Sequence, residues 1–144
     1  MSQIRPIAIC VFSKDDRILV FEGYDKVKDE TFYRPLGGGI EFGETAEEAV
    51  RRELKEEINA DVDDIHFLGA LENIFTFNDL KYHEIVLVHD GVLKESGLYK
   101  QAVIVGHEAD VDEPFKSMWK SLSEFGEGKS ILHPTGLFEL LIVR

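Results

Sequence analysis

The sequence has little positive charge, a single cysteine and no long apolar run, and each shortage excludes a class of protein. It has 16 Lys and Arg against 28 Asp and Glu, a formal net charge of −12, so it lacks the basic surface that holds a nucleic-acid polymer. With Cys10 alone, no intramolecular disulfide can form, which fits a reducing compartment. No run approaches the roughly 18 apolar residues of a membrane span, and the N-terminus lacks the pattern of a signal peptide. We therefore expect a cytoplasmic protein that binds neither a nucleic-acid polymer nor a membrane.

The 144 residues, 44% of them hydrophobic, suit one domain with one core, which we place at residues 1–144. Two β-rich apolar runs, 7–12 and 17–23, are separated by a short polar segment and predict a hairpin. We interpret the polar segment 24–35 as a loop and the glycine-rich segment 36–44 as a tight turn.

Further strands are predicted in the second half of the chain. Residues 65–77 and 82–93 favour two strands around a polar turn, and 101–106 favours another. Residues 116–125 favour a strand that leads into a short helix, and the proline and apolar residues of 133–144 predict a final helix. Helices that alternate with strands of different lengths indicate an α/β sandwich.

The clearest helix runs from Thr45 to Ile58. Thr45 is a good N-cap, and Glu48 three residues later completes a capping box. Asn59 follows the last turn, and asparagine is the usual second choice after glycine for the left-handed residue that ends a helix.

This helix carries most of a dense acidic segment, in which seven glutamates fall between Glu41 and Glu57. At about 100° per residue, Glu53, Glu56 and Glu57 lie together beside the apolar stripe that docks the helix, and we expect no basic side chain among them. Close carboxylates resist joint ionisation, and a bound divalent cation removes that repulsion. Carboxylate oxygens suit Mg²⁺, Ca²⁺ or Mn²⁺, and the sequence has no His-Cys cluster with zinc spacing.

The glycines at 37–39 support this interpretation. A glycine run lets the backbone approach a ligand closely and present N–H groups to an anion. Without it, a solvated acidic helix would be the simpler interpretation. A turn suited to an anion beside a face suited to a cation indicates a metal-bound phosphate.

The same residues match the Nudix signature, G-x5-E-x7-R-E-U-x-E-E-x-G-U, in which U is a bulky aliphatic residue. The match begins at Gly38 and Glu44, continues through residues 52–57 and ends at Asn59 and Ala60, which replace the usual glycine and aliphatic residue. Every charged position is filled. The sequence therefore resembles the MutT-like members of the Nudix hydrolase superfamily.

The resemblance implies an α/β/α sandwich with a mixed central sheet. It also implies the hydrolysis of a nucleoside diphosphate linked to another group, with (d)NTPs among the candidates, using Mg²⁺ or Mn²⁺. Glu53, Glu56 and Glu57 would bind the metal, and one of them or a glutamate elsewhere would activate water.

Other roles also follow from the resemblance. Arg52 would act in catalysis by orienting a glutamate through a charge-assisted hydrogen bond. Glu44 would support the metal-bound waters. Gly38 would shape the loop at the metal, and with Gly39 it would approach the substrate.

Residues outside the signature supply further candidates, each with a structural alternative. Glu84 opens an apolar strand and could serve as a further metal ligand or base, or simply mark an exposed strand start. Arg5 and Arg34 could hold a substrate phosphate, with surface salt bridges as the alternative. Four aromatic residues could stack on a base or belong to the core: Phe12, Tyr33, Phe75 and Phe77.

Two other classes of function stay open beside the hydrolase. One is a non-catalytic Nudix-fold module that binds or senses a nucleotide, although such proteins typically lose the signature acids. The other is a structural or cation-storing acidic domain. The group attached to the diphosphate, the number of metal ions, the general base and a homodimer are all left open.

Overall fold

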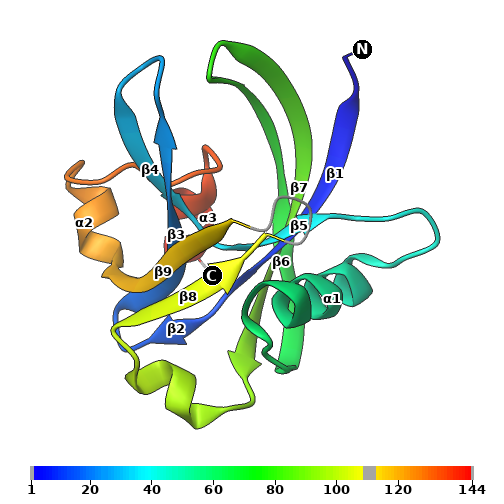
Figure 1. Cartoon of the computed structure of the whole chain (residues 1–144), viewed down its shortest axis with the longest axis vertical. Coiled ribbons are helices and arrows are strands. Elements are labelled where there is room, and N and C mark those ends of the chain that lie inside the picture. The colour runs from blue at the N-terminus through cyan, green and yellow to red at the C-terminus, as the bar shows by residue number, and fades with distance from the viewer. Residues whose placement is uncertain (1, 109–112, 144) are drawn as a thin grey trace.

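The computed structural model describes residues 2–108 and 113–143 and contains two β-sheets with helices on either side (Figure 1). The strands are β1 (Ile4–Val11), β2 (Ser13–Lys14), β3 (Arg17–Asp25), β4 (Glu30–Arg34), β5 (Leu36–Gly39), β6 (Val62–Phe77), β7 (Leu80–Leu93), β8 (Val103–His107) and β9 (Pro114–Ser121). The helices are α1 (Ala46–Ile58), α2 (Leu122–Gly126) and α3 (Leu137–Val143), with a short 3-10 helix at Ser96–Lys100.

The central sheet is mixed and has the order β5-β1-β7-β6. Strand β1 runs parallel to β7 and antiparallel to β5, and β6 runs antiparallel to β7. The second sheet is antiparallel, with the order β2-β3-β9-β8 and with β4 paired to the end of β3. The predicted α/β class with a mixed central sheet is confirmed, and the second sheet is an addition to it.

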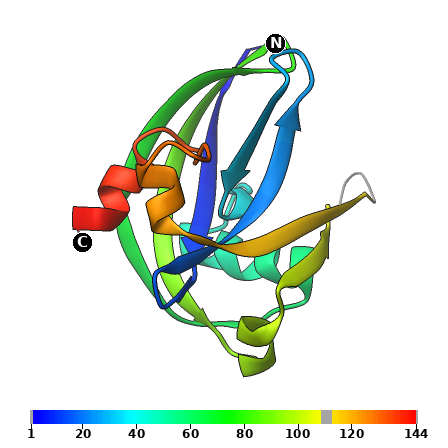
Figure 2. The same cartoon turned by 90° about the vertical axis from the view of Figure 1, so that its left-hand side faces the viewer.

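Strand β1 lies between two cores because its side chains alternate in direction. Ala8 and Cys10 pack in the core that α1 covers, whereas Ile7 and Ile9 pack in the core that α2 and α3 cover. Figure 2 shows α1 on one side of the central strands and α3 on the other. A strand buried on both faces has the continuous apolar sequence seen here, and Cys10, a free cysteine, is buried within it.

The first predicted hairpin is wrong in its pairing. Both apolar runs are strands, but β1 and β3 belong to different sheets, and only Ser13–Lys14 pairs with Arg17–Ile18. Each run is buried within its own sheet, so nearness in the sequence did not determine which strands pair.

Two predicted connections are strands instead. The segment 24–35, expected to be a loop, continues β3 to Asp25 and returns as β4. Its polar character comes from the turn, where the buried Asp25 carboxylate accepts N–H groups of Val27 and Lys28, both at 3.0 Å. Residues 36–39 of the expected glycine turn form β5, which pairs with β1 through backbone groups that need no side chains.

The remaining predicted elements are present. Strands β6 to β9 and helices α2 and α3 lie where the sequence predicts them, and Arg144 at the end of the last helix falls outside the described residues. No helix in the described part of the chain is both long and apolar enough to cross a membrane.

Helix α1 has the predicted caps at both ends. The Thr45 hydroxyl accepts the Glu48 N–H at 3.1 Å, and the Glu48 carboxylate accepts the Thr45 N–H at 2.9 Å. Asn59 ends the helix in the left-handed conformation, with φ 53° and ψ 40°. These contacts fix where the helix begins and therefore where its glutamates lie.

We predict that Thr45→Ala lowers the free energy of unfolding by about 1 kcal/mol, because the N–H of Glu48 loses its acceptor. Thr45→Ser keeps the hydroxyl and should unfold close to wild type. Urea denaturation of the three proteins measures the difference. An equal loss in both variants would show that the threonine methyl group, and not the cap, stabilises this end of the helix.

Candidate active site

Arg52, on α1, binds the acidic side chains around it. Its Nε and Nη2 donate to the two carboxylate oxygens of Glu44 at 2.7 and 2.9 Å. Its Nη1 donates to Glu53 at 2.9 Å and to Glu56 at 3.4 Å, and Nη2 also donates to the Gly39 carbonyl at 2.9 Å. The expectation that no basic side chain accompanies the acids is therefore wrong. The fixed fork of the guanidinium joins the loop before the helix to the helix itself.

The bond to Arg52 sets the ionisation of Glu44. Hydrogen bonds from Arg52, together with the N–H of Glu41, lower the pKa of Glu44 to about 2. Glu44 is therefore ionised at neutral pH, and its carboxylate holds Arg52 in place.

Glu57 is the buried acid of the group, with only 4% of its surface exposed. It accepts a hydrogen bond from the Gly37 N–H, while its Oε1 has no partner among the described residues. Burial, reinforced by the charges of Glu53 and Glu108, raises the pKa of Glu57 to about 9. Burial also raises the pKa of Glu53. An unpartnered buried carboxylate beside like charges is costly unless a cation joins it.

The glycines of β5 make room for this cluster. A Cβ at Gly38 would lie 2.5 Å from the Glu53 carboxyl carbon. At Gly37 φ is +148°, and a Cβ would lie 2.1 Å from the Ala8 carbonyl oxygen. The glycine run therefore serves close packing of the acids as well as strand pairing.

These groups line a cavity of about 340 Å³. The lining residues are Arg5, Ile7, Phe21, Arg34, Gly37, Gly38, Gly39, Glu41, Arg52, Glu53, Glu56, Glu84 and Glu108. All the predicted site residues are among them except two. Glu44 is connected to the cavity through Arg52, and Glu57 through Gly37 and the charge of Glu53.

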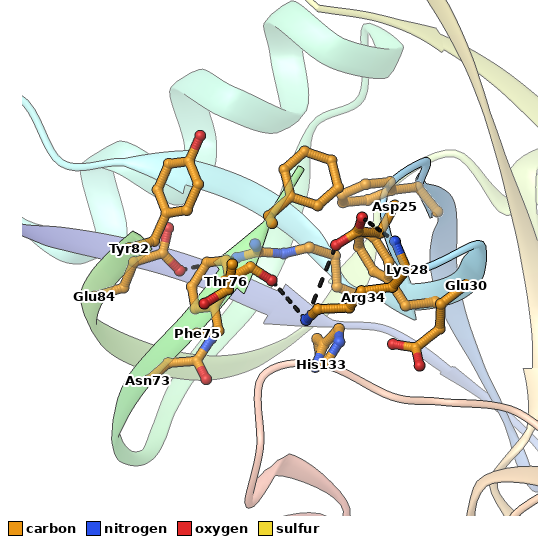
Figure 3. Close-up of a pocket in the computed structure, with 13 residues that line it drawn as sticks. Asp25, Lys28, Glu30, Arg34, Asn73, Phe75, Thr76, Tyr82, Glu84 and His133 are labelled. Atoms are coloured by element: carbon orange, nitrogen blue, oxygen red, sulfur yellow. Dashed lines mark hydrogen bonds and ion pairs between the residues drawn. The ribbon is translucent and has the colours of Figure 1, made fainter. Parts of the chain in front are cut away.

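Arg34 and Glu84 line both this cavity and a neighbouring one of about 270 Å³, which Figure 3 shows. Their Nη2 and Oε1 atoms are 3.8 Å apart. Their side chains are only 18% and 6% exposed, so neither a surface salt bridge for Arg34 nor an exposed strand start for Glu84 describes them. The Glu84 Oε1 accepts no hydrogen bond among the described residues. Burial lowers the pKa of Arg34 even beside Glu84.

Arg5 lies in β1 itself, where the sequence placed it before the strand, and it is directly opposite Glu84 of β7. It is exposed and forms no ion pair with any described residue. Arg5 is therefore a cation that can reach an anion in the cavity.

The donor set fits a hard divalent cation. The acids of α1 offer carboxylate oxygens, one of which, on Glu57, is buried without a hydrogen-bond partner among the described residues, and such ligands suit Mg²⁺ or Mn²⁺. In residues 2–108 and 113–143, no three His, Cys, Asp or Glu side chains lie in a geometry that could hold a metal ion. Glu53 and Glu56 instead bond to Arg52, so a cation would compete with Arg52 for their oxygens.

The sequence analysis missed Glu108, which follows β8, lines the cavity and contributes to the raised pKa of Glu57 and Glu53. An acid beside an apolar strand, the signal that identified Glu84, was present here too. Among the aromatic candidates, Phe75 and Phe77 line a neighbouring cavity. Phe12 is fully buried in the core, and Tyr33 packs near Phe125.

Comparison with known proteins gives one family and several similar folds. The family model described as NUDIX domain matches residues 2–134. A NUDIX hydrolase from Nitrosomonas europaea is 15% identical with a TM-score of 0.67, covering 97% of this chain and 87% of its own. A MutT NUDIX hydrolase from Burkholderia pseudomallei is 18% identical with a TM-score of 0.65, and the match covers 99% of this chain and 98% of that hydrolase. A protein described as an ADP compounds hydrolase is 21% identical with a TM-score of 0.65, and the match covers 99% of this chain and 72% of that protein.

We predict that in the presence of a chelator the free energy of unfolding falls as pH rises from about 5 to 9. The pKa of Glu57 is about 9 in the folded state and near 4.5 when unperturbed, so the folded state binds more protons across this window. Its stabilising contribution is complete below the unfolded pKa and is lost as pH rises through the folded pKa. One proton gives a slope of at most about 1.4 kcal/mol per pH unit.

Urea denaturation at stepped pH measures this slope. Glu57→Gln, which has no charge to bury, should show a flatter dependence. Glu47→Gln is the matched control, because Glu47 lies on the same helix but is exposed and pairs with Arg51 at 3.7 Å. The assignment fails if wild type and Glu57→Gln show the same slope.

Proposed function

Because the chain belongs to the Nudix family, we propose that it hydrolyses a pyrophosphate bond in a nucleoside diphosphate linked to another moiety, with (d)NTPs among its candidate substrates. Nudix hydrolases act on small nucleotide-derived compounds. We further propose that this reaction requires Mg²⁺ or Mn²⁺.

The observation that supports the metal requirement is the buried carboxylate of Glu57. Its Oε1 has no hydrogen-bond partner among the described residues, the charge of Glu53 acts on it, and both acids have a raised pKa. Two such groups are stabilised as anions when a divalent cation becomes the dominant local charge. A structural acidic helix would instead place its carboxylates in water.

Glu53, Glu56 and Glu57 would hold the cation. When bound, it would neutralise charge that develops on the phosphates and lower the pKa of a coordinated water. Arg52 positions Glu53 through the 2.9 Å hydrogen bond, and Glu44 in turn fixes Arg52.

The substrate phosphates would meet cations on the other side of the cavity. Arg5 has no ion pair among the described residues, and Arg34 shares only the 3.8 Å contact with Glu84. The backbone at Gly38 and Gly39 allows close approach of an anion. Glu84 has a buried oxygen that accepts no hydrogen bond from any described residue, so it is a candidate for proton acceptor beside the acids of α1.

We predict metal-dependent release of product from at least one member of a panel of nucleoside triphosphates, nucleotide sugars, ADP-ribose and dinucleoside polyphosphates. Glu53→Gln, Glu56→Gln and Glu57→Gln should each lower kcat by about 100-fold or more, because each removes a charge from the metal-binding face. Glu44→Gln should cost about 10- to 100-fold, because it loosens Arg52. Assays in Mg²⁺, in Mn²⁺ and in chelator measure these effects.

Glu47→Gln again serves as the control on the exposed face of the same helix and should retain wild-type activity. Tight binding of one compound without cleavage of any would favour the nucleotide-sensing module. Cleavage that proceeds equally in chelator would contradict the assigned role of the acids.

We also predict that Gly38→Ala lowers kcat by about 10-fold or more without unfolding the protein. The added Cβ would meet the Glu53 carboxyl group at 2.5 Å, and this carboxylate sits on a movable side chain that can shift away. Gly97→Ala is the matched control, since a Cβ there meets nothing within 4 Å. Kinetics with circular dichroism separate displacement of Glu53 from loss of fold, and unchanged kcat would show that Glu53 need not lie against Gly38.

A further inference from the structure

Helix α1 covers only part of one face of the central sheet. Side chains alternate along β1, so Ile4 and Pro6 point to the same side as Ala8. Ala8 is fully buried in the core beneath α1, whereas Ile4 is 58% exposed and Pro6 is exposed as well. Figure 1 shows the upper parts of β1, β6 and β7 extending beyond α1. The sheet therefore has an uncovered area on the side of this helix.

The strand register extends this area over three strands, because residues that pair in register lie on the same face of a sheet. All its members are exposed or half-buried. We call them the open face, and they are Ile4 and Pro6 of β1, Ala70, Glu72 and Ile74 of β6, and Lys81, His83, Ile85 and Leu87 of β7.

The open face is mainly apolar. Ile74 is 75% exposed, and Ile85 and Leu87 are half-buried beside it and Ile4. A single exposed apolar side chain is ordinary, whereas a contiguous apolar patch marks an interaction surface. The two acidic or basic side chains of the open face, Glu72 and Lys81, form no ion pair with any described residue.

These two charges lie symmetrically about one row of the open face. Ile4, His83 and Ile74 pair in register and form this row across β1, β7 and β6. Glu72 lies two residues to one side of the row and Lys81 two residues to the other, since Glu72 pairs beyond His83 and Lys81 precedes it. A two-fold axis along the row would place Glu72 of each copy beside Lys81 of the other, and would bring Ile74 against its own copy.

We propose that the open face binds the open face of a second copy of this chain, about a two-fold axis along the Ile4–His83–Ile74 row. Sheets that pack face to face lie about 10 Å apart, a separation that facing side chains fill. This inference goes beyond the proposed function and does not depend on it. Arg5 and Glu84, which line the first cavity, alternate with the open face and point to the other side of the sheet, so the dimer leaves that cavity open.

The size of the open face determines how tightly two copies bind. Three strands are about 14 Å wide, and the distance from Lys81 to Leu87 is about 20 Å, which gives roughly 280 Å² in projection. Stable interfaces bury about 800 Å² on each partner. The open face therefore predicts a weak dimer, which forms at high protein concentration and dissociates on dilution.

Sedimentation equilibrium of the full chain from roughly 10 μM to 1 mM tests the dimer. We expect the average mass to rise toward twice that of the monomer. Ile74→Asp should lower the association constant at least about tenfold, because it removes apolar contact and places two carboxylates against each other on the axis. Ile142→Asp is the matched control, because Ile142 is 57% exposed on α3 and lies outside the open face. It should associate like wild type.

Charge reversal tests the orientation of the two copies. Glu72→Lys and Lys81→Glu should each weaken self-association several-fold, because like charges then meet across the axis. An equimolar mixture of these two variants should associate more strongly than either alone, since every altered position faces its opposite charge. Both residues are exposed, and circular dichroism checks that each variant is folded.

Three results would overturn the inference. They are a monomer at every concentration, a dimer that persists unchanged in Ile74→Asp, and a mixture of the charge-reversed variants that associates no better than its components. None of these measurements requires a substrate. A hydrolase that stays monomeric would therefore remove only the dimer, and a dimer that cleaves nothing would remove only the proposed function.

Discussion

The guanidinium of Arg52 is the group on which the acidic face depends. Glu44, Glu53 and Glu56 all bond to it, as does the Gly39 carbonyl. Because these donors form a rigid planar fork, the loop after β5 and the helix α1 cannot move independently. Without the guanidinium of Arg52 the crowded glutamates would repel each other, and α1 would lose its hydrogen bond to the Gly39 carbonyl of β5. Arg52 thus allows the protein to fold with the acids, to which we assign the proposed reaction, close together.

How much of this could be predicted from the sequence depends on whether the signal was local. The limits and caps of α1 follow from Thr45, Glu48 and Asn59, because capping involves only neighbouring residues. The strands β1 and β5 could not be paired in this way, since their contact is made by backbone groups that carry no side-chain signature. Residues 24–35 were predicted to be a loop because they are mostly polar. The sequence does not distinguish Asp25, which is buried and accepts hydrogen bonds in the hairpin turn, from an aspartate exposed in a loop.

In the candidate site, too, the residues on one helix could be predicted from the sequence, whereas those on paired strands could not. The acids of α1 were found because a helix has a fixed period. The same period, about 100° per residue, places Arg52 roughly 40° from Glu56, so the expectation of no basic neighbour was wrong because it overlooked this position. The position of Glu84 depends on the strand register, which places it opposite Arg5 of β1. The alternation of β7 carries this information: Val88 and Val86 pack in a core, and Glu84 and Tyr82 continue the same face into the two cavities.

The charges at the first cavity explain why a cation and a substrate should bind together. Among the described residues, five carboxylates and three guanidiniums line it, with Glu44 and Glu57 close behind. A diphosphate that entered this excess of negative charge would be repelled by the acids that are proposed to act on it. A divalent cation on Glu53, Glu56 and Glu57 would offset most of their negative charge, and Arg5 and Arg34 could then meet the phosphates from the other side. The proposed cation would compete with Arg52 for Glu53 and Glu56, and without a cation the hydrogen bonds from Arg52 hold these two carboxylates in place.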